Sequence, residues 1–574
     1  MAGWLASVAF TATVAAAAGA LGQPAPTPLL GPPVRLETAP GTAPTPLPQE
    51  RATRPRRDSG VTARPLPALD RESAGWTTAE GGFGTALWHA SRWATVERLL
   101  GRLPAAATPA RHALARGLLM SAAARPEGAP DGAFLERRLA GLLALGDGPA
   151  AHALARALPA ERLGGPLARP AAEAALLAGV PADACRAARR PELDTTELFW
   201  RRLLVACDAL DGQGDRVALG LDLLREQGRD PGAAFVALVE AALGGEKPAV
   251  DALPDGLAVV LAAKAGAAPT AAALAAAGPG VAAAIARADA MPPALRLAAA
   301  ERMAARGLVD GTLLARLYAG LPLPPEALAE AAAGAAKDHG PAGRALLFQA
   351  ARLQVVPAQR LERLAAGWRH AAAAGVPLAY AAAAAPLVAE ISPSADLVPH
   401  AAAALRIAFA AGDVATADRW LTLVGARIGD RQALAVYAAA APLLRLARGD
   451  EGPAWNAESA QRWSAAMGGP ATSRTAVGLA LLASLGDLAD SDEWVALARE
   501  PDGPPPASSV WFAQEAAARE ARLGEQVALA LIALGEAPVP HPLAAFSALN
   551  GLRLAEQTPA ARRIALEIAL LAGL

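Results

Sequence analysis

Short alanine-rich apolar stretches, separated by brief breaks of glycine, proline or aspartate, fill this 574-residue chain from about Gly82 onward. Within each stretch, apolar residues recur at intervals of three and four positions, which is the helical period. Alanine loses no rotamer freedom in a helix and buries no polar group. Aromatic residues make up only 4% of the chain. The pattern therefore predicts an all-α fold of about 25 helices.

The same pattern predicts how these helices are arranged. Alanine on facing surfaces lets two helices approach closely, near the short end of the usual interaxial range of about 8–10 Å. A single hairpin of such helices has too little apolar bulk to be stable alone, whereas stacked hairpins share a continuous core. We therefore predict an α-solenoid, a right-handed superhelix of stacked short helical hairpins, over residues 82–574. Its scarcity of large aromatic residues favours an extended stack.

Three predicted turns share one form, in which Gly-Asp or a similar pair ends one helix and an alanine-rich helix follows. They are LALGDGPAAHALARAL (Leu143 to Leu158), LDGQGDRVALGLDLL (Leu210 to Leu224) and FAAGDVATADRWLTL (Phe409 to Leu423). With alanine at close-packing positions, as at Ala415 and Ala417, these segments resemble degenerate tetratricopeptide-like repeats. The resemblance implies stacked helical hairpins that offer an extended concave surface to a partner.

The chain is also similar to alanine-rich exported helical-repeat proteins of GC-rich bacteria, some of which carry an antifreeze-like label. Ice-binding alanine helices place threonine at a regular interval on one face, and no such interval occurs here. An antifreeze-like label on this chain would therefore reflect alanine content only.

The N-terminal residues predict export. Trp4 to Leu21 is an apolar run without charge, and Ala18-Gly19-Ala20 fits the A-x-A pattern of signal-peptidase sites. Residues 1–22 are therefore predicted to form a signal peptide or an N-terminal anchor. The first basic residue is Arg35, so the positive region that usually precedes such a run is missing. A start codon further upstream, an uncleaved membrane anchor and a buried helix remain open alternatives.

A proline-rich segment follows, and we predict that residues 23–81 form a disordered or polyproline II linker. Proline fixes φ and removes a backbone donor, so the segment cannot build a helix or a sheet. It contains RATRPRR, Arg51 to Arg57. This cluster is interpreted as solvated linker charge, with contact to an anionic surface as the alternative.

The two cysteines, Cys185 and Cys207, lie on successive predicted helices, one over about residues 182–189 and the next ending near Leu210. Two antiparallel helices can bring the Cα atoms within the roughly 7 Å that a disulfide requires. In an oxidising compartment such a pair is expected to bond. We therefore predict a Cys185–Cys207 disulfide and a periplasmic or secreted protein, which an uncleaved N-terminus would tether to the inner membrane. Two buried free thiols are the alternative.

One uncharged stretch, Ala371 to Ala389, approaches the length of a transmembrane helix. Pro377 and Pro386 interrupt it, and we expect them to break the helix into pieces. The stretch is therefore predicted to form a buried hairpin of the solenoid.

Charge and motifs exclude several classes of function. The net charge is −1 and no basic stripe is present, which argues against a nucleic-acid partner. The only lysines are Lys247, Lys264 and Lys337, a bias that we interpret as codon usage that gives the arginines no particular role. The seven histidines do not stand at metal-ligand spacing, and no nucleotide-binding loop or nucleophile elbow occurs. We therefore predict no metal, no cofactor and no catalytic residue.

One segment points to an alternative. WNAESAQRW, Trp455 to Trp463, contains the pair Glu458-Ser459, which resembles the catalytic Glu-Ser pair of soluble lytic transglycosylases. That family also has an alanine-rich helical superhelix. The resemblance implies that Glu458 is the general acid of an envelope enzyme that acts on peptidoglycan.

The preferred interpretation is a non-catalytic exported scaffold that binds a protein or polysaccharide partner in the cell envelope. Exposed aromatic residues such as Trp88, Trp93, Trp455 and Trp463 could anchor that partner. Alternatively, these residues fill gaps between alanine-rich helices.

Overall fold

The computed structural model describes residues 73–159, 163–190, 197–449, 455–466, 473–488 and 507–574. Over these residues it contains 28 α-helices and no strand, which confirms the all-α prediction. None of the described helices is long and apolar enough to cross a membrane. The predicted signal or anchor segment, and the linker up to residue 72, lie outside the described residues.

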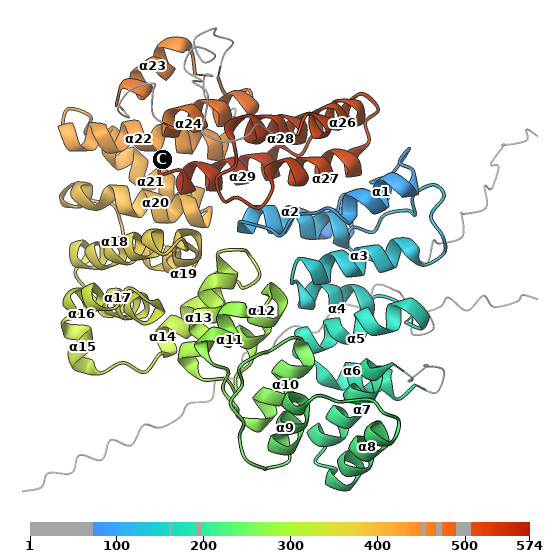
Figure 1. Ribbon diagram of the computed structural model, residues 1–574. Coiled ribbons are helices and arrows are strands. Elements are labelled where there is room, and N and C mark those ends of the chain that lie inside the picture. The colour runs from blue at the N-terminus through green and yellow to red at the C-terminus, as the bar shows by residue number, and fades with distance from the viewer. Residues whose placement is uncertain (1–72, 160–162, 191–196, 450–454, 467–472, 489–506) are drawn as a thin grey trace, which may run out of the picture. The chain divides into compact units, whose positions relative to one another are not determined.

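The helices follow one another in short lengths along the chain (Figure 1). The first ten are α1 (Trp93–Leu100), α2 (Pro109–Met120), α3 (Ala133–Ala144), α4 (Gly148–Arg156), α5 (Ala168–Leu177), α6 (Pro181–Ala188), α7 (Leu198–Leu210), α8 (Gly214–Glu226), α9 (Ala233–Ala242) and α10 (Gly256–Ala265). The next ten are α11 (Ala271–Ala276), α12 (Pro279–Arg287), α13 (Pro293–Ala304), α14 (Gly311–Gly320), α15 (Pro325–Ala329), α16 (Ala331–Lys337), α17 (Pro341–Leu353), α18 (Pro357–Ala373), α19 (Pro377–Ala389) and α20 (Ala401–Ala411).

The remaining helices are α21 (Val414–Gly425), α22 (Arg431–Arg448), α23 (Ala457–Ala466), α24 (Ser473–Ser484), α26 (Ser508–Arg519), α27 (Leu523–Leu534), α28 (Pro542–Leu554) and α29 (Thr558–Leu571). Three 3-10 helices are described, η1 (Thr78–Glu80), η3 (Gly165–Leu167) and η4 (Ala395–His400). Many α-helices begin with proline, whose fixed φ suits the first helical position and whose missing N–H costs nothing there.

Helices that are neighbours in sequence pack against each other, as α4 does with α5, α12 with α13, α17 with α18 and α27 with α28. One core cluster, built largely of alanine and leucine, extends from Leu87 to Leu574. The stacked helical hairpins predicted from the alanine pattern are therefore present.

The predicted Gly-Asp turns form as expected. Gly412 ends α20 in the left-handed region at φ 77°, where glycine avoids the steric cost of a Cβ. Asp413 then caps α21 by accepting a hydrogen bond from the Thr416 amide at 3.0 Å. Ala417 is fully buried, as predicted, whereas Ala415 is exposed. Only one of the two proposed close-packing alanines therefore faces another helix.

The expectation that Pro386 breaks its helix is wrong. Pro377 starts α19, but the helix continues through Pro386 to its end. Pro386 is exposed, so its ring lies at the surface while the other faces of α19 are buried. Proline at this position leaves the carbonyl of Ala382 without its usual amide partner. That carbonyl lies against Gly311 at the start of α14, where a Cβ would come within 2.5 Å of its oxygen.

The packed part of the chain begins before Gly82. The Trp76 amide donates to the Met120 carbonyl at 2.6 Å. Arg138 of α3 donates to the carbonyl of Ala74 at 2.8 Å. Residues from Ala74 onward thus bind to α2 and α3, and the end of the predicted linker lies earlier than residue 81.

The first helices also contact the last ones. α1 and α2 pack against α27, and α2 against α29, which Figure 1 shows as blue helices beside red ones. The Ala110 amide at the start of α2 donates to both carboxylate oxygens of Glu567 on α29, at 3.2 and 3.0 Å. Arg111, only 1% exposed, donates to the carbonyls of Ala537 and Pro538 just after α27, at 2.7 and 3.0 Å. An extended stack would have left these helices apart.

Buried ion pairs join helices in the interior. Asp147, the cap of α4, accepts from His112 Nε2 at 2.9 Å and from Arg116 Nε at 2.6 Å, both on α2. Burial acts to raise the pKa of Asp147, but the hydrogen bond from His112 and the charge of Arg116 outweigh it and lower the pKa to about 2. Glu301 of α13 is held by Arg344 of α17 at 2.8 and 2.5 Å.

Candidate functional site

The predicted disulfide is present in the structure. It joins Cys185 of α6 to Cys207 of α7, with the two Cα atoms 5.7 Å apart. Both residues are buried, so the bond ties the hairpin together and offers no exposed reactive thiol. Near the bond, the C-terminal ends of the two helices are also joined by Arg189, which follows α6 and donates to Asp211, just after α7, at 2.8 Å. A buried disulfide is typical of proteins in an oxidising compartment.

Of the four tryptophans considered as partner anchors, two are buried in the core and two are half-buried against it. Trp88 and Trp463 are 3% and 4% exposed. Trp93 lies edge-on to Phe134, with ring centroids 6.5 Å apart. Trp455 lies edge-on to Trp463 at 5.9 Å. Trp88 and Trp463 therefore fill space between helices, and their interpretation as exposed anchors is wrong, whereas Trp93 and Trp455 pack against the core but stay half-buried.

Large apolar side chains are exposed elsewhere. Trp511 and Phe512 on α26 are 50% and 76% exposed. Successive residues of a helix point about 100° apart, so these two rings do not share one face. Leu353 and Val355, at the turn between α17 and α18, are 67% and 88% exposed. Sequence reasoning did not single out these residues, since each lies in an apolar stretch like many others.

Glu458 lies on α23, and its carboxylate faces solvent. Its side chain is 74% exposed, and its nearest charged partner is Arg462, one turn along the helix at 3.8 Å. Ser459 instead binds the side chain of Asn456, its hydroxyl lying 2.9 Å from the amide oxygen. Among the described residues, the glutamate of the pair that resembles the lytic transglycosylase motif thus lies on an exposed face of α23.

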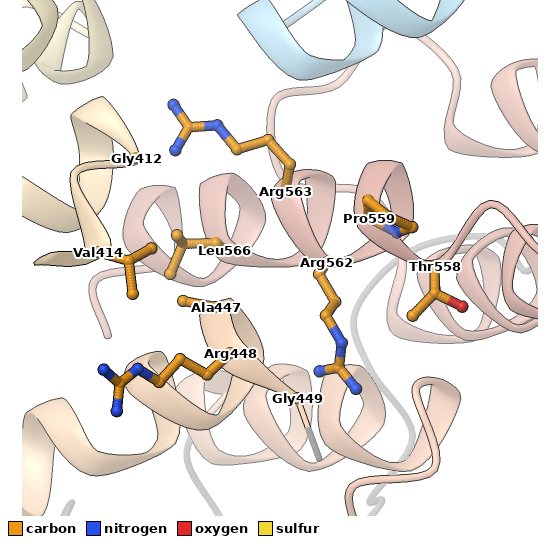
Figure 2. A pocket seen from close by; sticks show the side chains of 10 residues that line it. All are labelled: Gly412, Val414, Ala447, Arg448, Gly449, Thr558, Pro559, Arg562, Arg563 and Leu566. Atoms are coloured by element: carbon orange, nitrogen blue, oxygen red, sulfur yellow. The ribbon is translucent and has the colours of Figure 1, made fainter. Parts of the chain in front are cut away.

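The candidate site is a surface pocket of about 650 Å³ beside α29. It lies where the start of α29 meets the end of α22 and the turn between α20 and α21. Its described lining residues combine apolar groups, glycines and three arginines: Gly412, Val414, Ala447, Arg448, Gly449, Thr558, Pro559, Arg562, Arg563 and Leu566. Figure 2 shows Leu566, Val414 and Ala447 in its middle, between the arginines.

Two adjacent arginines on α29 reach the C-terminal ends of two other helices. Arg562 donates to the carbonyls of Arg445 and Leu446 near the end of α22, at 3.3 and 3.4 Å. Arg563 donates to the carbonyls of Phe409 and Ala410 near the end of α20, at 3.4 and 3.0 Å. Figure 2 shows the two side chains leaving α29 toward different sides. A cation at a helix C-terminus also favours the helix dipole.

Each arginine of the pocket has a carboxylate close by. Arg562 contacts Asp487 at 2.6 and 3.1 Å, and that carboxylate is fully buried. Arg448 lies 3.0 Å from Asp418. Arg563 lies 3.7 Å from Glu567, which also caps α2. These carboxylates are not among the described lining residues, but they neutralise part of the positive charge of the pocket.

The start of α29 adds positive potential to the pocket. No side chain caps this 14-residue helix, and its first turn contains no acidic residue. Unpaired amides and the helix dipole place roughly half a positive charge at such an end. Arg562 and Arg563 follow within the next turn, although anionic side chains are the ones favoured near this end of a helix. The arrangement favours an anionic ligand with an apolar neighbour.

A second pocket, of about 600 Å³, lies at the connection between α8 and α9. Its lining includes Arg225 and Arg229 but also Asp230 and Glu240. The two acidic and two basic side chains of this lining offset each other's charge. Unlike the pocket at α29, this pocket therefore does not favour an anionic ligand.

The residues described here contain no cluster of three or more histidine, cysteine, aspartate or glutamate side chains that could hold a metal ion. No protein-family model, curated protein or solved structure matches this chain.

The arginines are the site residues that the sequence interpretation missed. They were attributed to codon usage, yet Arg111, Arg562 and Arg563 each bind main-chain carbonyls next to a helix end. One signal was available. Arg562-Arg563 stands in the early turns of an apolar helix that begins Thr-Pro, where acidic residues are the usual choice.

Proposed function

We propose that this protein is a non-catalytic helical-repeat scaffold that binds a protein or polysaccharide partner in the cell envelope, after export to the periplasm or beyond the cell. The observation that carries this proposal is the pocket at α29, where three arginines surround an apolar centre formed by Val414, Ala447 and Leu566. The buried disulfide supports an oxidising location.

The chemistry of the pocket supports binding over catalysis. Arginine stays protonated in proteins, so it recognises anions but does not exchange protons at neutral pH. The pocket's described lining contains no carboxylate and no histidine. Its volume lies within the range of about 300–1,000 Å³ that is usual for ligand pockets.

Site-specific photo-crosslinking in intact cells of the native host tests the proposal. A photoreactive residue replaces Val414 in the pocket, and a matched chain has it at exposed Leu353 on α17. A discrete covalent adduct at position 414 only is expected, and its digestion by protease or by glycosidase identifies the partner class. Equal labelling at both positions, or none at 414, contradicts the proposal.

The alternative function, a lytic transglycosylase activity of this protein on peptidoglycan, is tested separately. Purified protein and its Glu458→Gln variant are incubated with peptidoglycan, and soluble fragments are measured by chromatography. We expect no release by either protein, because Glu458 lies in open solvent. Release that the substitution abolishes would establish the lytic activity instead.

A further inference from the structure

We propose that the outward face of α8 is a self-association surface, on which a second copy of this chain packs its own α8 in the antiparallel direction. This surface is separate from the pocket at α29, so self-association goes beyond the proposed function and does not depend on it. Self-association is measured on the purified protein alone, whereas the scaffold function is tested by the adduct at residue 414. Either can therefore fail without the other.

The inward face of α8 is fixed against the rest of the fold. Val217, Leu221 and Leu224 are buried, and among the described helices α8 packs chiefly on α7. Gly220 lies so close to α7 that a Cβ there would come within 2.7 Å of the Val205 side chain. Figure 1 shows α8 below α7, at the lower edge of the drawn helices. The opposite face of α8 is therefore held outward.

The outward face carries two leucines one turn apart. Leu219 and Leu223 are 61% and 40% exposed. Residues four positions apart lie on the same side of a helix, so these side chains form one apolar patch. Arg216 and Glu226 stand three residues before and three residues after the leucines, and they continue the same stripe. Both are exposed, and neither belongs to an ion pair within the described residues.

Arg216 and Glu226 are not placed to stabilise α8 itself. Acidic side chains are favoured at the start of a helix and basic ones at its end, yet Arg216 lies in the first turn and Glu226 is the last residue. Asp215 and Arg225 do meet the preference. Arg225 also pairs with Asp222 along the helix at 2.8 Å. The charges of the stripe therefore remain available to a partner.

The order of residues along the stripe is symmetric. Arg216 and Glu226 lie five residues on either side of Leu221, and the two leucines lie two residues on either side of it. When two copies of α8 pack antiparallel about a two-fold axis at Leu221, each Arg216 meets a Glu226 and each Leu219 meets a Leu223. Closed dimers use such isologous contacts. Parallel packing would place like charges together, which is unfavourable. The stripe is therefore complementary to a second copy of itself.

Sedimentation velocity of the protein purified from its native host measures this association. A contact made by one helix face is smaller than the roughly 1,200 Å² of a standard interface. We therefore expect a weak dimer, with a Kd on the order of 10–100 µM. The mass should rise from one chain toward two as the concentration increases from about 1 to 300 µM. A protein that stays monomeric through this range overturns the inference.

Charge reversals place the contact on α8. Arg216→Glu brings two carboxylates together at both ends of the stripe and should raise the Kd at least about tenfold. The double variant Arg216→Glu and Glu226→Arg exchanges the two charges and should return the Kd to within about threefold of the wild type. Arg225→Glu is the matched control, because it makes the same change of charge on the same helix away from the stripe. No recovery in the double variant, or an equal loss in the control, overturns the inference.

A neutral substitution tests the apolar part of the surface. Leu219→Ser removes two leucines from each dimer and should also raise the Kd at least about tenfold. Its control is Leu353→Ser on α17, where the leucine is similarly exposed, at 67% against 61%. Both side chains lie at the surface, so both variants are expected to fold, and circular dichroism checks this. A dimer that Leu219→Ser leaves unchanged has its interface elsewhere and overturns the inference.

Discussion

Arginine side chains hold this fold together at the scale of single residues. In a chain with few large side chains, a long guanidinium both covers apolar surface and satisfies carbonyls that a helix end leaves unpaired. Arg111, Arg562 and Arg563 each reach across to the end of another helix. Lysine could not replace them, because its single ammonium group cannot present a planar fork to two carbonyls.

Replacement of Asp487 by asparagine should be severely destabilising. Asp487 is fully buried and balances Arg445 and Arg562, at 3.1 and 2.6 Å. Breaking a buried pair leaves an uncompensated charge, at a cost of about 3–5 kcal/mol. Urea unfolding followed by circular dichroism measures the loss. The control Glu515→Gln breaks an exposed pair on α26 and should change stability by less than about 1 kcal/mol. Similar losses in both variants would contradict this role.

Asp147 should contribute stability that is lost in acid. Its pKa is about 2 in the folded protein, below the ordinary 3.8. Between these values the unfolded chain binds more protons, so stability rises with pH across this window. The contribution, about 2 kcal/mol, is complete above about pH 5 and vanishes near pH 1. Unfolding curves of the wild type and Asp147→Asn should converge as the pH falls. A gap that stays constant through this range would refute the assignment.

Glycine positions decide how closely neighbouring helices approach. Gly311→Ala should cost about 1–3 kcal/mol, because its Cβ would lie 2.5 Å from the Ala382 carbonyl oxygen of α19. Gly320, at the other end of α14, has open space around it. Gly320→Ala should be neutral or slightly stabilising, since alanine is the better helix former. Thermal unfolding of both variants compares the ends of one helix, and equal effects would argue against close packing at Gly311.

The α6–α7 hairpin should depend on its disulfide. The bond closes a loop across a separation of 22 residues, for which the loop-entropy account gives about 3 kcal/mol. The double variant Cys185→Ala and Cys207→Ala should lose about this amount and become insensitive to reductant. Urea unfolding with and without dithiothreitol measures both effects. Wild-type stability that reductant leaves unchanged, with the bond shown to be reduced by mass, would contradict the prediction.

At the scale of the whole molecule, the contact of α2 with α27 and α29 should make distant segments open together. Arg111→Met removes the donor to Ala537 and Pro538 and should weaken the contact by about 1–3 kcal/mol. Hydrogen exchange followed by mass spectrometry should then show faster exchange in α2 and also in residues 535–538. Faster exchange in α2 alone would show that the two segments are not coupled.

The sequence predicted the parts of this structure that depend on local chemistry. Gly412 and Asp413 mark a turn by their own conformational preferences, and Cys185 and Cys207 are the chain's two cysteines and lie on consecutive helices. The contact between Ala110 and Glu567 spans 457 residues. Glu567 in a helical pattern looks like any solvated glutamate, so nothing in the sequence distinguishes it. The pocket was missed for the same reason, because its arginines come from α22 and α29 and only meet in the folded chain.

The bond between Ala110 and Glu567 also has a consequence for biosynthesis. A ribosome adds Glu567 457 residues after Ala110, which takes on the order of half a minute at about 5–20 residues per second. Throughout that time the Ala110 amide of α2 lacks the carboxylate of Glu567. A product that stops before α29 would contain the carbonyl partners of Arg111 but not Glu567, so the Ala110 amide would lack its partner. We therefore expect the contact between α2 and α29 to form only in chains that have been translated through Glu567, and a truncated chain to be cleaved faster by protease than the full one.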